Sequence, residues 1–117
     1  MGFLTTHVLD TRDGQPAAAL QIELFAIGED GRTALQTITT NADGRADGPL
    51  LEDDAFRRGV YELVFHAGDY FRANGVALPE PAFVDVVPLR FGIADETSHY
   101  HVPLLVSPWS YSTYRGS

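Results

Sequence analysis

The chain has 117 residues, contains no cysteine and carries a formal net charge of −8. This length suits one domain with a buried core, so we expect a single domain over residues 1–117. The lack of cysteine excludes disulfides, thiolate nucleophiles and sulfur-ligated metal sites. The acidic balance argues against nucleic acid and membrane partners, because it repels phosphate backbones and anionic headgroups.

The beginning of the chain bears on where the protein resides. MGFLTTHVLD has neither the basic segment nor the long apolar run of a signal peptide. No stretch of the sequence approaches the ~20 apolar residues of a membrane-spanning helix. Together with the missing cysteines, these features predict a soluble protein of the cytoplasm.

The first half of the chain alternates between short apolar patterns and turn residues, which is typical of an all-β sandwich. In residues 3–10 the alternation places Leu4, Thr6 and Val8 on one face, the expected core face. The Asp-Gly turn within GEDGR, residues 28–32, predicts a hairpin between its flanking strands. Strands are expected at residues 3–10, 19–27 and 32–40.

The second half of the chain continues this pattern and adds one helix. Asp69 is expected to cap a short helix over residues 69–75, and Gly75 is expected to end it. Pro88 and Pro103 interrupt two strand patterns, and proline cannot donate a ladder hydrogen bond. Each therefore predicts a bulge, an edge strand or a solvent-facing position. Further strands are expected at residues 60–68, 83–93, 99–109 and 111–117.

Two histidines share an unusual outward face in the segment HYHVPLLVSP. Alternation makes Tyr100 and Val102 part of the core face and places His99 and His101 opposite, in line with Leu105. A half-apolar outward face of this kind indicates burial against another subunit rather than exposure to solvent.

His7 also points away from the expected core, and the outward histidines allow two interpretations. They could be ligands of a zinc ion, but no cysteine or evident carboxylate completes the set. They could instead act as acids and bases, because the histidine pKa of about 6.5 lies near neutrality. Arg45, which ends the turn NADGR, is suited to bind a planar anionic or carbonyl-rich ligand, although composition alone favours a surface arginine.

Three segments carry a specific combination of these residues: HVLDTRDGQPA at 7–17, TTNADGR at 39–45 and HYHVPLLVSPWSYSTYRGS at 99–117. In these segments the chain resembles the transthyretin-related family of 5-hydroxyisourate hydrolases. The resemblance extends over the whole chain at matching length. The ending Tyr-Arg-Gly-Ser is its most specific part.

The resemblance implies a fold, an assembly and a site. The fold is a transthyretin-like sandwich of two four-stranded sheets with one short helix. The assembly is a homotetramer, built as a dimer of dimers, with active sites in the channel between the dimers. No catalytic role is transferred to His99. The residues that match the family's site are His7, Arg45, His101 and Ser117 as catalytic residues, and Tyr114, Arg115 and Gly116 as substrate-binding residues.

The implied reaction is the opening of the 5-hydroxyisourate ring by water, in urate degradation, to 2-oxo-4-hydroxy-4-carboxy-5-ureidoimidazoline. No cofactor and no metal are expected. His7 and His101 are expected to orient and deprotonate the water, and Arg45 to stabilise the developing oxyanion. Ser117 is expected to hydrogen-bond substrate or water through its hydroxyl or terminal carboxylate. The alternatives are a non-enzymatic carrier of a small ligand in the same channel, a plain interaction module, and a zinc hydrolase using His7, His99 and His101.

Overall fold

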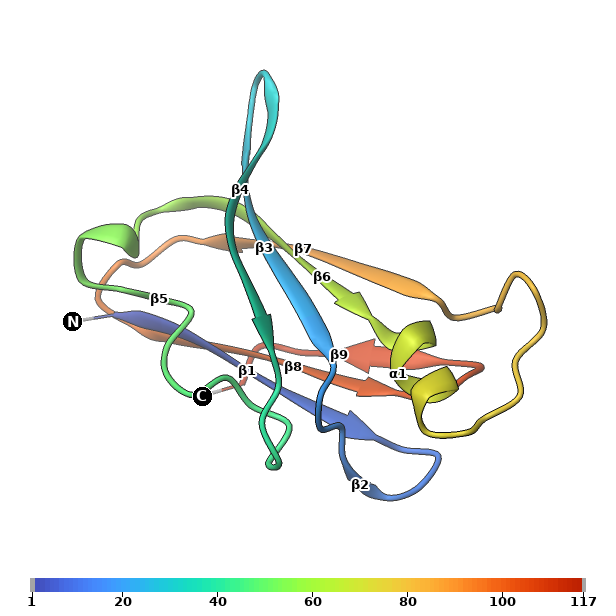
Figure 1. Ribbon diagram of the computed structural model, residues 1–117. Helices are drawn as coiled ribbons and strands as arrows, with labels where there is room; N and C mark the ends of the chain where they lie inside the picture. The colour runs from blue at the N-terminus through green and yellow to red at the C-terminus, as the bar shows by residue number, and fades with distance from the viewer. Residues whose placement is uncertain (1, 117) are drawn as a thin grey trace.

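The computed structural model describes residues 2–116 and shows two β-sheets packed face to face, with one short α-helix at one end (Figure 1). The helix is α1 (Ala67–Ala73), and a single 3-10 turn, η1, spans Asp53–Ala55. The strands are β1 (Phe3–Asp10), β2 (Gln15–Pro16), β3 (Gln21–Gly28), β4 (Gly31–Thr39), β5 (Leu51–Glu52), β6 (Gly59–His66), β7 (Val86–Ile93), β8 (His99–Val106) and β9 (Tyr111–Thr113).

The two sheets differ in how their strands pair. One sheet has the order β4-β3-β6-β7 and is antiparallel throughout, as expected for a four-stranded sheet. The other has the order β2-β1-β8-β9, and its central strands β1 and β8 run parallel. The short strand β5 also pairs with β1, so this sheet has five strands within the described residues rather than the four that were expected.

The core lies between the sheets and follows the alternation of the sequence. Along β1 every second side chain is buried, with Leu4 and Val8 inaccessible to solvent, so the predicted core face of this strand is confirmed. From the opposite sheet, Leu24 of β3 and Leu63 and Phe65 of β6 belong to the same buried cluster. Burial of one such side chain typically contributes ~1.5–3 kcal/mol, so the core fixes the outward faces of β1 and β8 firmly.

The helix begins two residues earlier than expected, at Ala67, and the prediction that Asp69 caps it is wrong. Asp69 lies in the first turn, and His66 occupies the cap position without a side-chain cap hydrogen bond. At this start Gly68 is buried, and its N–H donates to the Asp85 carbonyl at 2.9 Å. Gly75, at φ +81°, follows the helix end as expected. None of the helices within residues 2–116 is long and apolar enough to cross a membrane.

The two strand prolines, Pro88 and Pro103, avoid the loss of a ladder hydrogen bond in different ways. Pro88 is exposed on β7, the edge strand of its sheet, as predicted. The prediction for Pro103 is wrong, because this proline is buried in β8, which has neighbours on both sides. Its carbonyl accepts the Thr113 hydroxyl at 2.7 Å, so its nitrogen also faces the β9 side, where the ladder stops at Thr113. The missing N–H therefore falls at a gap in the pairing.

Candidate active site

The parallel pairing of β1 with β8 brings the outward histidines together. In this register Phe3 lies opposite His99, Thr5 opposite His101, and His7 opposite Pro103. These side chains share the face of the sheet that points away from the core, and each of the three on β1 is half-buried. Residues almost a full chain length apart in sequence thus form one continuous surface.

A threonine hydroxyl connects the two histidines of β8. Thr5 Oγ1 lies 2.7 Å from His99 Nε2 and 2.8 Å from His101 Nδ1. The His99 ring also stacks on Phe3, with ring centroids 4.1 Å apart and an interplanar angle of 14°. Sequence reasoning placed no function on Thr5, although the alternation of β1 puts it on the same face as His7.

Arg45 reaches this surface because its turn is docked against β1. His7 and Arg45 form an isolated β-bridge, and the Val8 N–H donates to the Gly44 carbonyl at 2.8 Å. The Asn41 side chain holds the turn from inside by accepting the Arg45 N–H at 3.1 Å. Gly44 is required here, because its φ is +75° and a Cβ would lie 2.4 Å from the Val8 carbonyl oxygen. The Asn-Ala-Asp-Gly-Arg pattern therefore serves to position an arginine beside His7.

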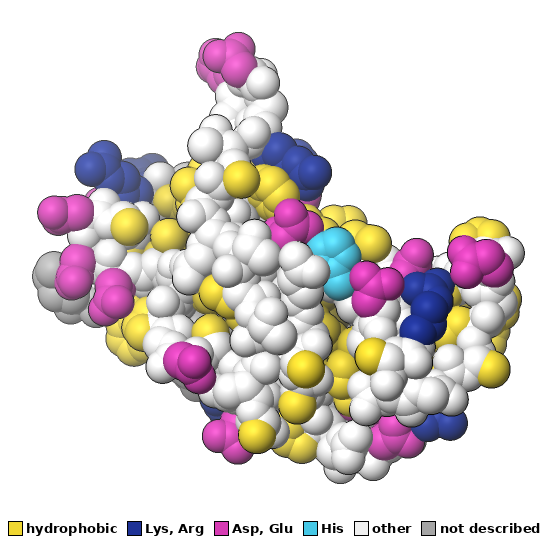
Figure 2. Space-filling model, viewed as in Figure 1, with side chains coloured by type: hydrophobic (Ala, Val, Ile, Leu, Met, Phe, Trp, Pro, Cys, Tyr) yellow, Lys and Arg dark blue, Asp and Glu magenta, His cyan; other side chains and the backbone are white. Residues whose placement is uncertain are grey.

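These elements enclose a solvent-open cavity of ≈ 460 Å³, within the usual range for small-molecule sites. Within residues 2–116 its lining includes Arg45 and two histidines and no Asp or Glu. This contrasts with the rest of the acidic protein, where carboxylates lie scattered among uncharged and hydrophobic side chains on the face shown in Figure 2. The lining residues are Phe3, Thr5, Thr6, Arg45, Ala46, Gly48, Pro49, His99 and His101.

Burial and the nearby arginine lower the pKa of His7 and of His101. Partial burial lowers the pKa of His7 below its usual 6.5, and the Arg45 cation lowers it further, against a smaller opposing effect of Asp43. Burial likewise lowers the pKa of His101, with Arg45, His99 and His7 acting in the same direction. A neutral imidazole can accept a proton, so both side chains are available as bases near neutral pH. Arg45 makes no ion pair with another residue in the range 2–116 and is free to meet an external anion.

The segment after β9 returns to the site at one point. The Gly116 N–H donates to the His101 carbonyl at 2.7 Å, in the same register as β9 but beyond the gap at Pro103. Tyr114 is 61% exposed. Arg115 lies over the Tyr100 ring, 4.0 Å from its centroid, and donates to the His99 carbonyl at 3.4 Å. Of the three residues expected to bind substrate, Gly116 contacts His101 through its backbone N–H and Arg115 contacts the His99 carbonyl through its guanidinium. Ser117 lies outside the described residues.

Gly116→Ala is expected to lower activity without unfolding the protein. A Cβ at this position would come within 2.7 Å of His101 Cδ2 and 3.2 Å of His101 Cβ, so either the imidazole or the segment must move. The neighbouring change Gly92→Ala, on an edge strand with open space around it, is the matched control. Steady-state kinetics and thermal unfolding of both variants test this, and equal turnover by the two would contradict the close approach.

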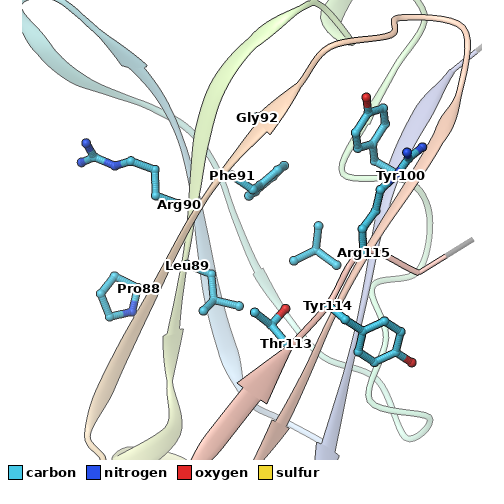
Figure 3. A pocket seen from close by; sticks show the side chains of 10 residues that line it. Pro88, Leu89, Arg90, Phe91, Gly92, Tyr100, Thr113, Tyr114 and Arg115 are labelled. Atoms are coloured by element: carbon cyan, nitrogen blue, oxygen red, sulfur yellow. The ribbon is translucent and has the colours of Figure 1, made fainter.

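A second cavity of the same volume, ≈ 460 Å³, opens between the edge strands β7 and β9 (Figure 3). Leu89 and Phe91 point into it from β7, and Arg115 and Tyr100 approach it from the other sheet (Figure 3). Its described lining residues include no histidine and no carboxylate, and its titratable side chains are those of Arg90, Tyr100, Tyr114 and Arg115. The cavity that combines histidines with an arginine is the one at β1 and β8.

The zinc alternative finds no support in this geometry. Across the described range, residues 2–116, no three His, Asp or Glu side chains are grouped closely enough to hold a metal ion. His99 Nε2 and His101 Nδ1 converge on the Thr5 hydroxyl, so Thr5 Oγ1 stands where an ion shared by these two nitrogens would bind. The arrangement instead combines two imidazoles of lowered pKa, a bridging hydroxyl and the Arg45 cation, which has no ion-pair partner within residues 2–116.

Comparisons with known proteins agree on one family. A profile of the HIUase/Transthyretin family matches residues 4–116. The curated protein "5-hydroxyisourate hydrolase 2" of Rhizobium meliloti (strain 1021) is 65% identical over 116 residues, covering 99% of this chain and 97% of that protein. The solved structure of Klebsiella pneumoniae 5-hydroxyisourate hydrolase matches this chain with a TM-score of 0.79 at 32% sequence identity. The match covers 98% of this chain and 99% of that chain.

Two further solved structures have a similar fold. One described as (S)-allantoin synthase has a TM-score of 0.94 at 48% identity; the match covers 99% of this chain but only 44% of that longer one. Sea bream transthyretin in complex with thyroxine has a TM-score of 0.86 at 30% identity, with coverage of 97% of this chain and 93% of that chain.

Fold and site together define a transthyretin-like β-sandwich with a histidine–arginine cavity on its outer face. The match over residues 4–116 and the 65% identity then place it: the chain belongs to the HIUase/transthyretin family. The expected family and its sandwich fold are thereby confirmed. The functional roles of the individual site residues stay predictions.

Proposed function

We propose that this chain catalyses the hydrolysis of 5-hydroxyisourate to 2-oxo-4-hydroxy-4-carboxy-5-ureidoimidazoline. One observation carries the proposal: in an acidic protein, a ligand-sized cavity is lined by Arg45, His99 and His101, and none of its described lining residues is Asp or Glu. Such a lining suits a flat, electron-rich ring with carbonyl oxygens. The curated relative named 5-hydroxyisourate hydrolase 2, at 65% identity, supports an enzyme over a carrier like the 30% identical transthyretin.

The residues divide the chemistry of ring opening between them. Water must lose a proton as it attacks the ring carbonyl, and the neutral imidazoles of His7 and His101 can accept it. The carbonyl oxygen gains negative charge in the transition state, and the Arg45 guanidinium can stabilise that charge through its planar donors. The ring nitrogen then leaves with a proton returned by the imidazolium, so the base is regenerated. No step requires a cofactor.

The pH dependence of kcat/KM follows from the lowered pKa values of His7 and His101. A base is active when unprotonated, so activity is expected to be lost as pH falls through the lowered pKa. The acidic limb should therefore have its midpoint below 6.5. A kcat/KM profile from about pH 5 to about pH 8, in buffers of constant ionic strength, measures it. A midpoint above 6.5 would contradict neutral, partly buried histidines as the bases.

We further propose a homotetramer, as a dimer of dimers, in the cytoplasm and in urate degradation. Supporting the assembly, β7 and β9 are the edge strands of the two sheets and lie at the same side of the sandwich. Exposed aromatic side chains gather nearby, with the rings of Phe83 and Trp109 6.1 Å apart. Analytical ultracentrifugation tests the tetramer; a monomer at micromolar concentration would refute it.

The decisive experiment generates the unstable substrate in place. Urate oxidase converts urate to 5-hydroxyisourate, and the decay of its near-ultraviolet absorption is timed with and without the purified protein. Faster decay in proportion to protein concentration supports the proposal. A decay rate equal to that of the spontaneous reaction would overturn it. Including a metal chelator in parallel separates this mechanism from a zinc hydrolase, which the chelator would inactivate.

A further inference from the structure

We propose that Thr5 is a positioning residue that selects the tautomer of His101, through a hydrogen-bond chain His101–Thr5–His99. The chain would leave His101 Nε2 unprotonated toward the cavity, ready to accept a proton from water. The inference rests on the proposed function and deepens it, by naming groups that neither the sequence motifs nor the family match assigns to the reaction.

The first step concerns the number of protons between the two rings. Thr5 Oγ1 has a single proton, and it lies within hydrogen-bond distance of two imidazole nitrogens, at 2.7 and 2.8 Å. The hydroxyl can donate to only one of them. If both contacts are hydrogen bonds, at least one histidine must donate to Thr5. The protonation of one ring therefore restricts the protonation of the other.

The second step concerns which nitrogen of His101 is left for chemistry. Its Nδ1 is engaged by Thr5, and Nε2 has no hydrogen-bond partner among residues 2–116. In a neutral imidazole only one nitrogen carries a proton. When Nδ1–H donates to Thr5 Oγ1, Nε2 holds the lone pair and can act as a base. When Thr5 donates to Nδ1 instead, Nε2 carries the proton and cannot.

The third step identifies what sets the direction of the chain. His99 Nε2 offers the Thr5 proton an acceptor, and the His99 ring is held in place by stacking on Phe3 at 4.1 Å. With the Thr5 proton directed at His99, the oxygen is free to accept from His101 Nδ1. His99 thus acts through Thr5 rather than on the substrate, and the family resemblance transferred no catalytic role to it.

The charged and titratable groups around His101 favour the same neutral state. His7 from β1, Arg45 from the docked turn and His99 from its own strand surround it, and each cationic form would repel a proton on His101. A ring that is neutral on average still has two tautomers, and charge alone does not choose between them. In this proposal the Thr5 hydroxyl, with its proton directed at His99, supplies that choice. Hydrogen-bond partners that orient a metal-ligating imidazole typically contribute ~10–100-fold to metal affinity or activity, and we expect an effect of similar size on kcat here.

Two substitutions at Thr5 test the chain. Thr5→Val keeps the shape and removes the hydroxyl, and kcat is expected to fall ~10–100-fold with little change in KM. Thr5→Ser keeps the hydroxyl and should restore most of kcat. The control is Thr11→Val at the residue that follows β1: its hydroxyl donates to the Val106 carbonyl of β8 and has no hydrogen bond to a histidine within residues 2–116. A Thr5→Val enzyme with the kcat and pH profile of the native protein would overturn the proposal, as would a Thr5→Ser enzyme no better than Thr5→Val.

His99→Phe tests the direction of the chain. Phenylalanine keeps a ring that can stack on Phe3 but removes the acceptor, so the Thr5 proton is free to turn to His101 Nδ1. A fall in kcat comparable to that of Thr5→Val is expected. Unchanged kcat would show that His99 does not set the direction and would overturn that part of the inference.

A readout independent of activity separates this inference from the proposed function. The ¹⁵N chemical shifts of the His101 ring distinguish a protonated from an unprotonated nitrogen in the uncomplexed protein. The native protein is expected to show protonated Nδ1 and unprotonated Nε2, and Thr5→Val should show a mixture. If the native protein fails to hydrolyse 5-hydroxyisourate but shows this tautomer, the proposed function is wrong and the hydrogen-bond chain from His101 through Thr5 to His99 is supported. If it hydrolyses 5-hydroxyisourate with Nε2 protonated, the function stands and the hydrogen-bond chain is wrong.

Discussion

His101→Ala is expected to lower kcat/KM for 5-hydroxyisourate by ~10²–10⁴, the usual effect of removing a well-placed acid–base group. The imidazole is neutral because burial and the nearby Arg45 lower its pKa, and it lines the cavity from the centre of β8. Its substitution removes no core side chain, since it lies on the outward face. The variant should therefore remain folded, with the loss confined to turnover in the coupled urate oxidase assay.

The matched control for this loss is His66→Ala. His66 belongs to the other sheet, where it pairs with Glu23 at 2.7 Å, and it is remote from the cavity lining. This variant should turn over at the native rate, while circular dichroism and thermal unfolding report whether either protein has lost structure. Native turnover by a folded His101→Ala protein would refute the role of this histidine.

Arg45→Ala should be the other large loss, ~10²–10³ in kcat, comparable to removing an oxyanion donor. The guanidinium makes no ion pair within residues 2–116, so its removal leaves no partner unpaired there. Arg45→Lys keeps the charge but loses the planar fork, and its kcat should fall between those of Arg45→Ala and the native protein. Because the cation lowers the pKa of His7 and His101, its loss should also move the acidic limb of the pH profile upward.

Arg12→Ala provides the control of equal charge change. Arg12 is exposed, and its one ion pair within residues 2–116 is with the adjacent Asp13, at 2.7 Å. An exposed pair contributes little to stability. Steady-state kinetics across pH for Arg45→Ala, Arg45→Lys and Arg12→Ala separate a local role from an effect of net charge. Equal kcat in the Arg12 and Arg45 variants, or an acidic limb that does not move in Arg45→Ala, would contradict the assignment.

Much of the fold was predictable because it depends on local patterns. Alternation identified the buried face of β1, and the Asp-Gly turn identified the hairpin between β3 and β4, which pair from Gly28 and Gly31 onward. The errors have other causes. At the helix start the Gly68 N–H donates to the Asp85 carbonyl, a tertiary contact that no local capping rule describes. Strand β5 is only two residues long, too short for any periodicity.

The candidate site likewise has parts that the sequence predicted and parts that it could not predict. Parity alone placed His99 and His101 on one outward face. Composition favoured a surface arginine at position 45, and only the family resemblance gave Arg45 a catalytic role. Parity could not show that Thr5 lies between the two histidines, because that contact joins residues 94 and 96 positions apart. It depends on the parallel register of β1 and β8, and a shift of one residue would put Thr6, a buried side chain, in its place.

The sequence by itself determined which residues face inward, which face outward and which family the chain resembles, because these follow from side-chain period and motif identity. Only the tertiary structure decided the pairing of β1 with β8 and the docking of the Arg45 turn. It also decided the gap at Pro103, beyond which Gly116 reaches His101. These are non-local contacts, set by burial of the common core, and they bring together the groups that lower the pKa values of His7 and His101.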